Sequence, residues 1–406
     1  GRTGRRPPPA AGPPAKQAMT RVDVARWAQH FGVELHFPAE HPRRTVEAMR
    51  LLTWAPRLSI PSLMAALYRA YWVEGRDIAD VEVLLDIAES VGLLRSEAQK
   101  GLLSPAVSQE LRRQTDAAIA DGVFGVPTFI VEGESGPRLF FGQDRLIFVE
   151  EALRSHPLMR DEGSTRPPRA VAPTPIGEYG AQVANQARKL TFVYDLSSPF
   201  AYLASTQVEK LAAACGAEVE FFPILLGGLF RSIGTPMVPI ASYSESKRRH
   251  AHEDLIRWAH HYGEPFHFQS RFPIHTVTAL RLALLASDDA ADSRDAGAPG
   301  PWAGTPRSRL SRQIFSACWS RDDDINDPAV LGQALREAGL PPSLLDRVAE
   351  PAIKDQLRKN TEEAERLGLF GVPSFLIPGT ADGPPQIFFG QDRLHFVERA
   401  LRRGRG

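Results

Sequence analysis

The feature that most constrains the fold of this sequence is an internal repeat. The phrase VFGVPTFIV at 123–131 returns as LFGVPSFLI at 369–377, and FFGQDRL follows each copy. Other segments align in the same order: 16–52 with 247–283, 69–84 with 316–331, and 111–127 with 357–373. A chain that repeats itself over this length is expected to form two related structural units rather than one continuous fold.

The second copy begins with a segment that the first copy lacks. In this segment the run LTFVYD predicts a strand, Ser198 followed by Pro199 predicts a helix start, Gly216 predicts its end, and AEVEFFPI predicts a second strand. A helical stretch from 244 to about 366, two short strands and a closing helix follow. This order is that of a thioredoxin fold interrupted by a helical domain.

Composition marks the expected domain limits. Residues 1–15 are rich in Arg and Pro and predict a disordered tail, and the Pro-rich residues 157–188 predict a linker. We therefore expect an incomplete domain at 16–156, without the N-terminal βαβ unit, and a complete domain at 189–403. An insertion around 287–306 has the composition of a surface loop. Either the first copy continues upstream of this sequence, which we favour, or it is degenerate and packs on the second copy in place of a dimer partner.

Charge and cysteine content exclude several classes of function. The 48 basic and 48 acidic side chains cancel, so no net field favours nucleic acid or an anionic membrane, and no apolar run approaches the roughly 18 residues of a membrane helix. Cys215 and Cys318 form no C-x-x-C motif, so neither a disulfide framework nor a metal site is predicted, and both are expected in the core. Without an apolar signal segment, the expected location is cytoplasmic.

Four phrases of the second copy carry a family resemblance: DLSSPFAYLA, DLIRWAHHYG, FGVPSFLI and FFGQDRLHFVERAL. They resemble the 2-hydroxychromene-2-carboxylate isomerases and the related kappa-class glutathione transferases of the DsbA-like thioredoxin superfamily. The resemblance covers about 190–403 in full, and 16–154 without the βαβ start. It implies a duplicated α/β, thioredoxin-like (DsbA-like) fold with an inserted helical domain, glutathione as cofactor, a small aromatic substrate, and either a homodimer or an intramolecular pseudo-dimer.

Ser198 is the expected catalytic residue. A serine followed by proline is most often a helix N-cap, but a hydroxyl beside free N–H groups at a helix N-terminus can also stabilise an anion. The resemblance implies that this anion is the thiolate of bound glutathione, with Pro199 and Phe200 in the same turn. Because Ser198–Ala201 contains no sulfur, dithiol redox chemistry is not expected.

The resemblance also assigns glutathione-binding residues near the C-terminus. A proline that opens a strand is an ordinary edge feature, but the resemblance implies a cis bond before Pro373 that leaves the Val372 backbone free to bind the cysteinyl backbone of glutathione. Gln391 and Asp392 either cap a helix or hold the γ-glutamyl end, with Asp392 on the ammonium. Lys247 aligns with a lysine that the family often places near glutathione.

The first copy keeps only part of this set. It has Val126-Pro127 and Gln143-Asp144 but no equivalent of the serine, and its strand TFIV is expected to keep an exposed edge. The leading hypothesis is a glutathione-dependent isomerase of aromatic catabolism, in which the cofactor thiol adds reversibly to a hydroxychromene carboxylate. The alternatives are a kappa-like glutathione transferase or peroxidase, and a non-catalytic binding or scaffold protein.

Overall fold

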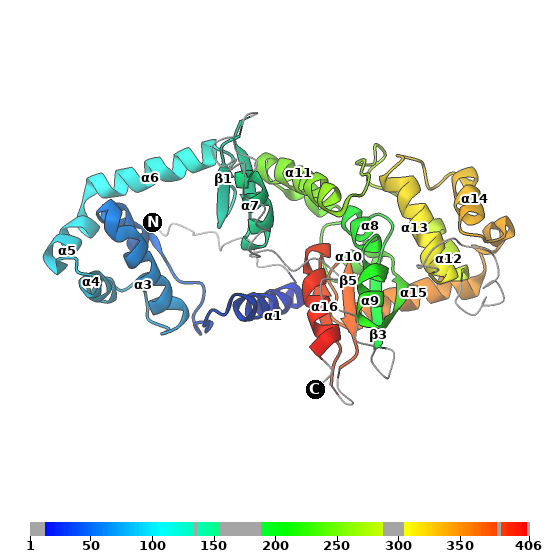
Figure 1. The fold of residues 1–406 in the computed structure, drawn as a ribbon, viewed down its shortest axis with the longest axis horizontal. Coiled ribbons are helices and arrows are strands. Elements are labelled where there is room, and N and C mark those ends of the chain that lie inside the picture. Colours follow the sequence, from blue (N-terminus) through cyan, green and yellow to red (C-terminus); the bar gives the residue numbers. More distant parts are fainter. Residues whose placement is uncertain (1–12, 134–135, 155–187, 287–303, 380–382, 404–406) are drawn as a thin grey trace, which may run out of the picture. The chain divides into compact units, whose positions relative to one another are not determined.

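The structure, a computed structural model, describes residues 13–133, 136–154, 188–286, 304–379 and 383–403 (Figure 1). The predicted linker except Arg188, most of the predicted tail and most of the predicted surface loop lie outside the described residues; Arg188 is the first residue of a strand, not part of a linker. The chain forms two compact units, one comprising residues up to Met19 together with those from Val126 onward, the other Thr20–Gly125. These two units do not coincide with the two copies of the repeat. The domain limits predicted from the sequence therefore stay a prediction.

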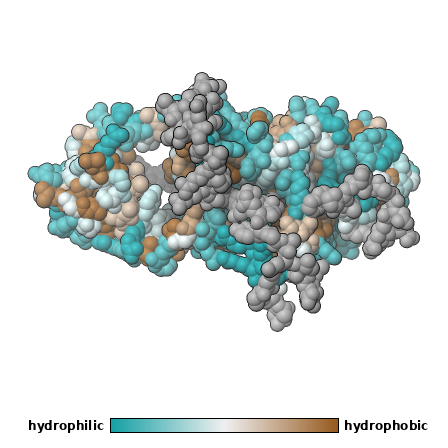
Figure 2. Space-filling model, viewed as in Figure 1, coloured by the Kyte–Doolittle hydropathy of each residue, from teal (hydrophilic) through white to brown (hydrophobic). Residues whose placement is uncertain are grey.

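The unit Thr20–Gly125 is helical. Helix α1 (Pro14–Phe31) leads into it, and its other helices are α2 (Val46–Trp54), α3 (Ile60–Trp72), α4 (Val81–Ser90), α5 (Arg95–Leu103) and α6 (Pro105–Ala120). Apolar residues at helical spacing bury one face of each of α2, α3 and α4, with Leu51, Leu63 and Leu84 at the centre of the core. Ser104 caps α6 by accepting a hydrogen bond from the Val107 N–H. Figure 2 shows hydrophobic residues among hydrophilic ones on the visible surface of this unit.

The second copy is built on a four-stranded mixed sheet in the order β4-β3-β5-β6. Its strands are β3 (Arg188–Tyr194), β4 (Ala217–Pro223), β5 (Ser374–Ile377) and β6 (Gln386–Phe389). β3 runs parallel to β4 and antiparallel to β5, which also pairs antiparallel with β6. The predicted strand LTFVYD is therefore confirmed as the central strand β3, and its apolar residues from Phe192 to Tyr194 are fully buried.

The helix predicted after β3 is two helices in the structure, α8 (Pro199–Ser205) and α9 (Val208–Cys215). The hydroxyls of Ser205 and Thr206 donate to the carbonyls of Tyr202 and Leu203, which caps α8 from within. The expectation of a single helix was wrong because these side-chain bonds compete with continued helical pairing. The predicted end at Gly216 is confirmed, since this glycine adopts a left-handed conformation with φ of 64°.

The chain segment between β4 and β5 is helical. Its helices are α10 (Leu226–Ser232), α11 (Glu245–Tyr262), α12 (Val277–Leu285), α13 (Pro306–Trp319), α14 (Pro328–Glu337) and α15 (Pro351–Arg366), with α16 (Leu394–Arg403) closing the fold. α10 and α15 pack against Val193 and Leu376 of the sheet. α9 and α16 pack on each other and contact β4 and β5, respectively. Among the described residues, no helix is both long and apolar enough to cross a membrane.

The first copy contributes a smaller ββα element that groups with the second copy. It consists of β1 (Thr128–Val131), β2 (Arg138–Phe141) and α7 (Leu146–Arg154). β1 and β2 form a two-stranded antiparallel sheet, and among the described residues no strand pairs with the other edge of β1. Within the described residues the expected open edge is therefore found, and Ile130 on β1 is 41% exposed.

Candidate functional site

Ser198 lies where the central strand passes into α8. It caps this helix by accepting a hydrogen bond from the Ala201 N–H at 3.2 Å, and it is 6% exposed. Pro199 and Phe200 follow in the first turn and are half-buried. Because α8 has only seven residues, the helix dipole expected to act here is smaller than that of the long helix predicted from the sequence.

The Ser198 hydroxyl also meets the loop before β5. Its Oγ donates to the Val372 carbonyl at 3.4 Å, across 174 positions of sequence, and the Val372–Pro373 peptide bond is cis. At this length the bond is weak, so the hydroxyl hydrogen can turn to a better acceptor at small cost. Within the described residues, the Val372 N–H has no hydrogen-bond acceptor.

Asp195 organises the turn that carries Ser198. Its Oδ1 accepts hydrogen bonds from the Ser197 N–H at 2.9 Å and from the Thr276 hydroxyl at 2.8 Å, and its Oδ2 accepts one from the Leu226 N–H at 2.7 Å. This carboxyl is 1% exposed, and burial raises its pKa. Asp195 was not predicted as a site residue from the sequence. An Asp at the end of a strand often accepts a hydrogen bond from the backbone N–H two residues later, which is an Asx turn, and this pattern could have indicated Asp195.

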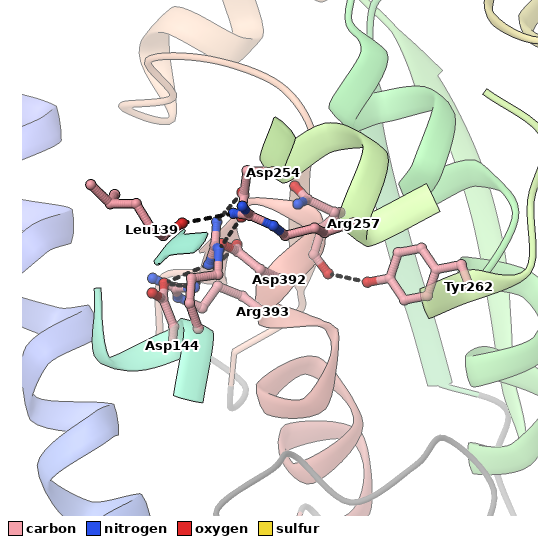
Figure 3. A network of polar contacts seen from close by, with 9 residues as sticks. Leu139, Asp144, Asp254, Arg257, Tyr262, Asp392 and Arg393 are labelled. Carbon is pink, nitrogen blue, oxygen red and sulfur yellow. Dashed lines mark hydrogen bonds and ion pairs between the residues drawn. The ribbon is translucent and has the colours of Figure 1, made fainter. Parts of the chain in front are cut away.

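Gln391 lies in the short 3-10 helix η7 (Gln391–Arg393), which contacts α8. Its backbone carbonyl accepts a hydrogen bond from the Tyr262 hydroxyl at 3.0 Å (Figure 3). Its side chain is 3% exposed, and the Nε2 group has no hydrogen-bond partner among the described residues. A buried amide donor without an acceptor is costly, so this group is available to a ligand.

Asp392 belongs to a charged cluster that joins the two copies of the repeat (Figure 3). Arg145 of the first copy contacts Asp392 at 2.8 Å, and Arg393 of the second copy contacts Asp144 at 2.8 Å. Each arginine also lies 3.1 Å from the aspartate that precedes it in its own copy. These contacts raise the pKa of Arg145 well above its usual value and lower that of Asp392, despite the burial of both.

Asp254 of α11 completes the cluster. It binds Arg145 through two hydrogen bonds of 2.8 Å, a bidentate geometry that fixes the guanidinium plane. On the same helix, Arg257 donates to the Leu139 carbonyl at 3.0 Å and lies 4.5 Å from the centroid of the Phe140 ring. The ββα element of the first copy is therefore attached to α11 by both charged and aromatic contacts.

Lys247 lies apart from these groups. It is half-buried in the first turn of α11, with its Nζ 4.0 Å from the centroid of the Tyr243 ring. Burial and the nearby charge of Lys16 lower its pKa. Within the described residues, no hydrogen bond or ion pair joins it to Ser198, Val372 or Gln391. The structure thus brings together Ser198, Val372, Pro373 and η7, and leaves Lys247 outside their contacts.

The cysteines lie in the core, as expected from the sequence. Cys215 is 2% exposed and Cys318 is 0% exposed. Burial raises the pKa of the Cys318 thiol to about 12, so this group is protonated at neutral pH. In the parts of the chain that the structure describes, no three His, Cys, Asp or Glu side chains gather as a metal site would require.

Comparison with known proteins agrees with this architecture. A model of the DSBA-like thioredoxin domain matches residues 2–154 and 189–402, two regions that overlap the two copies of the repeat. Human glutathione S-transferase kappa 1 is 25% identical over 223 residues, covering 53% of this chain and 91% of the relative. The 2-hydroxychromene-2-carboxylate isomerase of Sphingobium xenophagum is 26% identical over 221 residues, covering 53% and 98%.

Two further similarities are shorter or less close. The 2-hydroxychromene-2-carboxylate isomerase of Pseudomonas putida is 33% identical over 135 residues, covering 33% of this chain and 63% of the relative. A solved structure of selenomethionine 2-hydroxychromene-2-carboxylate isomerase superimposes with a TM-score of 0.44 at 21% identity, covering 53% of this chain and 95% of that one. Because the family model matches well over half of the sequence, the chain belongs to the family of DSBA-like thioredoxin domains.

Proposed function

We propose that this chain is a glutathione-dependent isomerase of the 2-hydroxychromene-2-carboxylate type, with Ser198 as the group that holds the thiolate of the cofactor. The observation that carries the proposal is the meeting of the Ser198 hydroxyl with the Val372 carbonyl before a cis proline. Relatives named as isomerases of this substrate and as kappa glutathione transferases support it. A cytoplasmic location, where thiols stay reduced, suits the same activity.

Two unsatisfied donors fit a tripeptide cofactor. The Val372 N–H can donate to a carbonyl of an extended peptide, and the buried Gln391 Nε2 group can donate to a carboxylate. Pro373 directly follows Val372, and Pro199 and Phe200 form the first turn of α8 after Ser198. Bound glutathione supplies the thiol that serves as the nucleophile of the reaction.

The charged cluster fits the ammonium group at the γ-glutamyl end. It contains the three carboxylates of Asp144, Asp254 and Asp392 and the two guanidinium groups of Arg145 and Arg393, so its net charge is minus one. A ligand ammonium would neutralise this charge. Asp392 therefore acts as one member of a paired cluster rather than as an isolated carboxylate. Lys247, which contacts none of these groups, is proposed as a contact at the edge of the cofactor.

Ser198 acts through its hydroxyl. The hydroxyl oxygen stays fixed by the Ala201 N–H, while its hydrogen turns from the Val372 carbonyl to the thiolate sulfur. A hydrogen bond to the charged form of an acid lowers its pKa, so the bound thiol ionises more readily at neutral pH. The substrate is expected beside this thiol, in contact with α10 and the helical insert. Asp195 connects the turn of Ser198 to α10, because it accepts a hydrogen bond from the Leu226 N–H at the start of that helix.

A kappa-like glutathione transferase or peroxidase is the second candidate. It is favoured by the match to 91% of human glutathione S-transferase kappa 1, and it uses the same cofactor site. The two candidates differ in the fate of glutathione, which an isomerase returns unchanged and a transferase consumes. Product analysis with a hydroxychromene carboxylate and with a haloarene electrophile separates them.

The first experiment is a calorimetric titration of the chain with glutathione, with thiolate absorbance followed against pH. We expect one glutathione per chain, bound with a lowered thiol pKa that Ser198→Ala moves back toward the free value. Ser104→Ala is the matched control, because Ser104 also caps a helix that begins with proline and lies in the other unit. If glutathione does not bind at all, the enzyme proposal fails and a non-catalytic binding or scaffold role replaces it.

A further inference from the structure

Thr276 occupies the N-cap position of α12 but does not cap this helix. Its carbonyl accepts the first helical hydrogen bond, from the Leu280 N–H at 2.8 Å, while its side chain bonds to none of the N–H groups of the first turn, all of which belong to described residues. A threonine at this position ordinarily uses its hydroxyl oxygen for that purpose. Here the hydroxyl instead donates to Asp195 Oδ1 at 2.8 Å, across 81 positions of sequence, and the residue is 3% exposed. The hydroxyl of Thr276 therefore serves a distant residue rather than its own helix.

The corresponding threonine of the first copy has the same backbone conformation. Thr45 precedes α2 with φ of −119° and ψ of 2°, and Thr276 precedes α12 with φ of −116° and ψ of 0°. Neither side chain caps its helix, but Thr45 is exposed and no described residue bonds to its hydroxyl. The same turn thus forms without a bond from the threonine hydroxyl, so the bond from Thr276 to Asp195 is not required to shape the start of α12.

Asp195 is the point at which the starts of three helices meet. The Ser197 N–H and the Thr276 hydroxyl donate to its Oδ1, and the Leu226 N–H donates to its Oδ2 at 2.7 Å. Ser197 directly precedes the cap of α8, Leu226 is the first residue of α10, and Thr276 directly precedes α12. Leu225, the N-cap residue of α10, has no side-chain acceptor, so Asp195 supplies one. Three donors on a buried carboxylate fix its orientation, because each lost bond is costly in this environment.

The position of Ser198 depends on this carboxylate. The Ser198 N–H donates to the Asp195 carbonyl at 3.1 Å, and the Ser197 N–H donates to the Asp195 side chain, so Asp195 holds the turn at two points. A group that stabilises a reacting atom has to be kept within about 0.5 Å of its productive position by supporting hydrogen bonds. The bonds that Asp195 accepts provide this support for the Ser198 hydroxyl.

We propose that Thr276 is a positioning residue for the thiol chemistry of Ser198, and that it acts through Asp195. This inference rests on the proposed function, in which Ser198 holds the thiolate of glutathione. Thr276 fixes the orientation of the Asp195 carboxylate, and the carboxylate fixes both the Ser198 turn and the first turn of α10, where the substrate is expected. One buried side chain thereby joins the thiol site to two helices of the helical insert.

Thr276→Val tests the inference, because it removes the hydroxyl but keeps the branched shape and the charge of the site. With glutathione bound, the pKa of its thiol should rise toward that of free glutathione, and kcat with a hydroxychromene carboxylate should fall about tenfold. The Kd for glutathione, measured at a pH below the pKa of the bound thiol, should change by less than about twofold, because Val372 and Gln391 are untouched. Thr276→Ser restores the hydroxyl and should restore the wild-type values. Thr45→Val is the matched control and should change none of them.

Leu226→Pro disturbs the same carboxylate from α10. Proline is tolerated at the first position of a helix, and the extended backbone of Leu225 suits a residue before proline. The ring removes the donor to Asp195 Oδ2 and takes up the space of the N–H, so the pKa of the bound thiol should rise at least as far as in Thr276→Val. Leu226→Ala keeps the N–H and should leave that pKa unchanged. A rise in Leu226→Ala equal to that in Leu226→Pro would contradict a role of Asp195.

Hydrogen exchange in the chain without glutathione separates failure of this inference from failure of the proposed function. The Ser197 and Leu226 amides should exchange about tenfold faster in Thr276→Val than in the wild type, and at the wild-type rate in Thr276→Ser. Faster exchange in a protein whose wild type binds no glutathione would refute the proposed function and reduce the Thr276–Asp195 bond to a structural link. Unchanged exchange and an unchanged thiol pKa in Thr276→Val, in a protein whose wild type binds glutathione, would overturn the inference alone.

Discussion

At the scale of single residues, Asp195 makes the clearest prediction about pH. Burial raises its pKa above the ordinary value of 3.8, so the folded state binds its proton more tightly than the unfolded state does. Stability linked to this group is then present at low pH and is lost as the pH rises from about 4 through the raised folded pKa. Asp195→Asn carries no such titration, so the variant should regain stability relative to the wild type over that interval.

The same substitution also has a constant effect. An amide cannot accept hydrogen bonds at both of its ends, so Asp195→Asn leaves one of the three donors around it without an acceptor, a loss of about 1–3 kcal/mol in the free energy of unfolding. Urea unfolding of both proteins between pH 4 and pH 7 checks both statements. A difference in unfolding free energy that stays constant or widens with pH would contradict the assigned shift.

The site residues that could be predicted from the sequence are those whose contacts are with residues nearby in the sequence. Ser198 caps the helix that follows it, and a serine followed by proline is a sequence pattern that predicts such a helix start. The unsatisfied amide of Gln391 and the contact between Ser198 and Val372 depend on chain segments far apart in sequence. No periodicity or spacing encodes such contacts, so the family resemblance alone pointed to these residues.

At the scale of secondary-structure elements, the turn before η7 depends on Gly390. Its φ of +102° is a conformation that side chains rarely adopt, and a Cβ there would lie 2.5 Å from Asp392 Oδ1. We expect Gly390→Ala to destabilise the second copy by about 1–3 kcal/mol and to weaken glutathione binding through the displaced Asp392. Calorimetric titration and thermal unfolding measure the two effects.

Gly142→Ala is the matched variant in the first copy. Gly142 has φ of +100° and the same 2.5 Å approach to Asp144 Oδ1, so a similar loss of stability is expected. Because Asp144 belongs to the first copy and contacts the second through Arg393, its effect on glutathione binding should be the smaller one. Equal loss of binding in both variants would show that the two turns contribute alike to the cofactor site.

The elements themselves were predictable where a pattern is continuous. β3 is an unbroken apolar strand and was expected as such, whereas the break between α8 and α9 follows from the side-chain bonds of Ser205 and Thr206. Serine and threonine occur inside many helices without ending them, so their identity alone could not place the break. The exposed edge of β1 was predictable because the repeat shows which strand is absent.

At the scale of the whole molecule, the charged cluster ties the ββα element of the first copy to the second. Arg145 pairs with Asp254 and Asp392, and all three side chains are less than 14% exposed. Arg145→Met should therefore destabilise the protein by about 3–5 kcal/mol, since it leaves two nearly buried carboxylates without this partner. Arg154→Met is the matched control, at the far end of helix α7, which begins directly after Arg145; Arg154 pairs with Glu150 at the surface and should matter by less than about 1 kcal/mol.

The cluster also predicts how acid separates the two copies. The lowered pKa of Asp392 contributes stability above its ordinary pKa of 3.8, and this contribution is lost as the pH falls through the lower folded value. Amide exchange in β1, β2 and α7 should thus stay slow at pH 5 in the wild type and accelerate only below about pH 4, whereas in Arg145→Met it should already be fast at pH 5. If Arg145→Met and Arg154→Met exchange alike at pH 5, contacts other than the cluster hold the first copy on the second, with the aromatic contact of Arg257 on Phe140 as the remaining candidate.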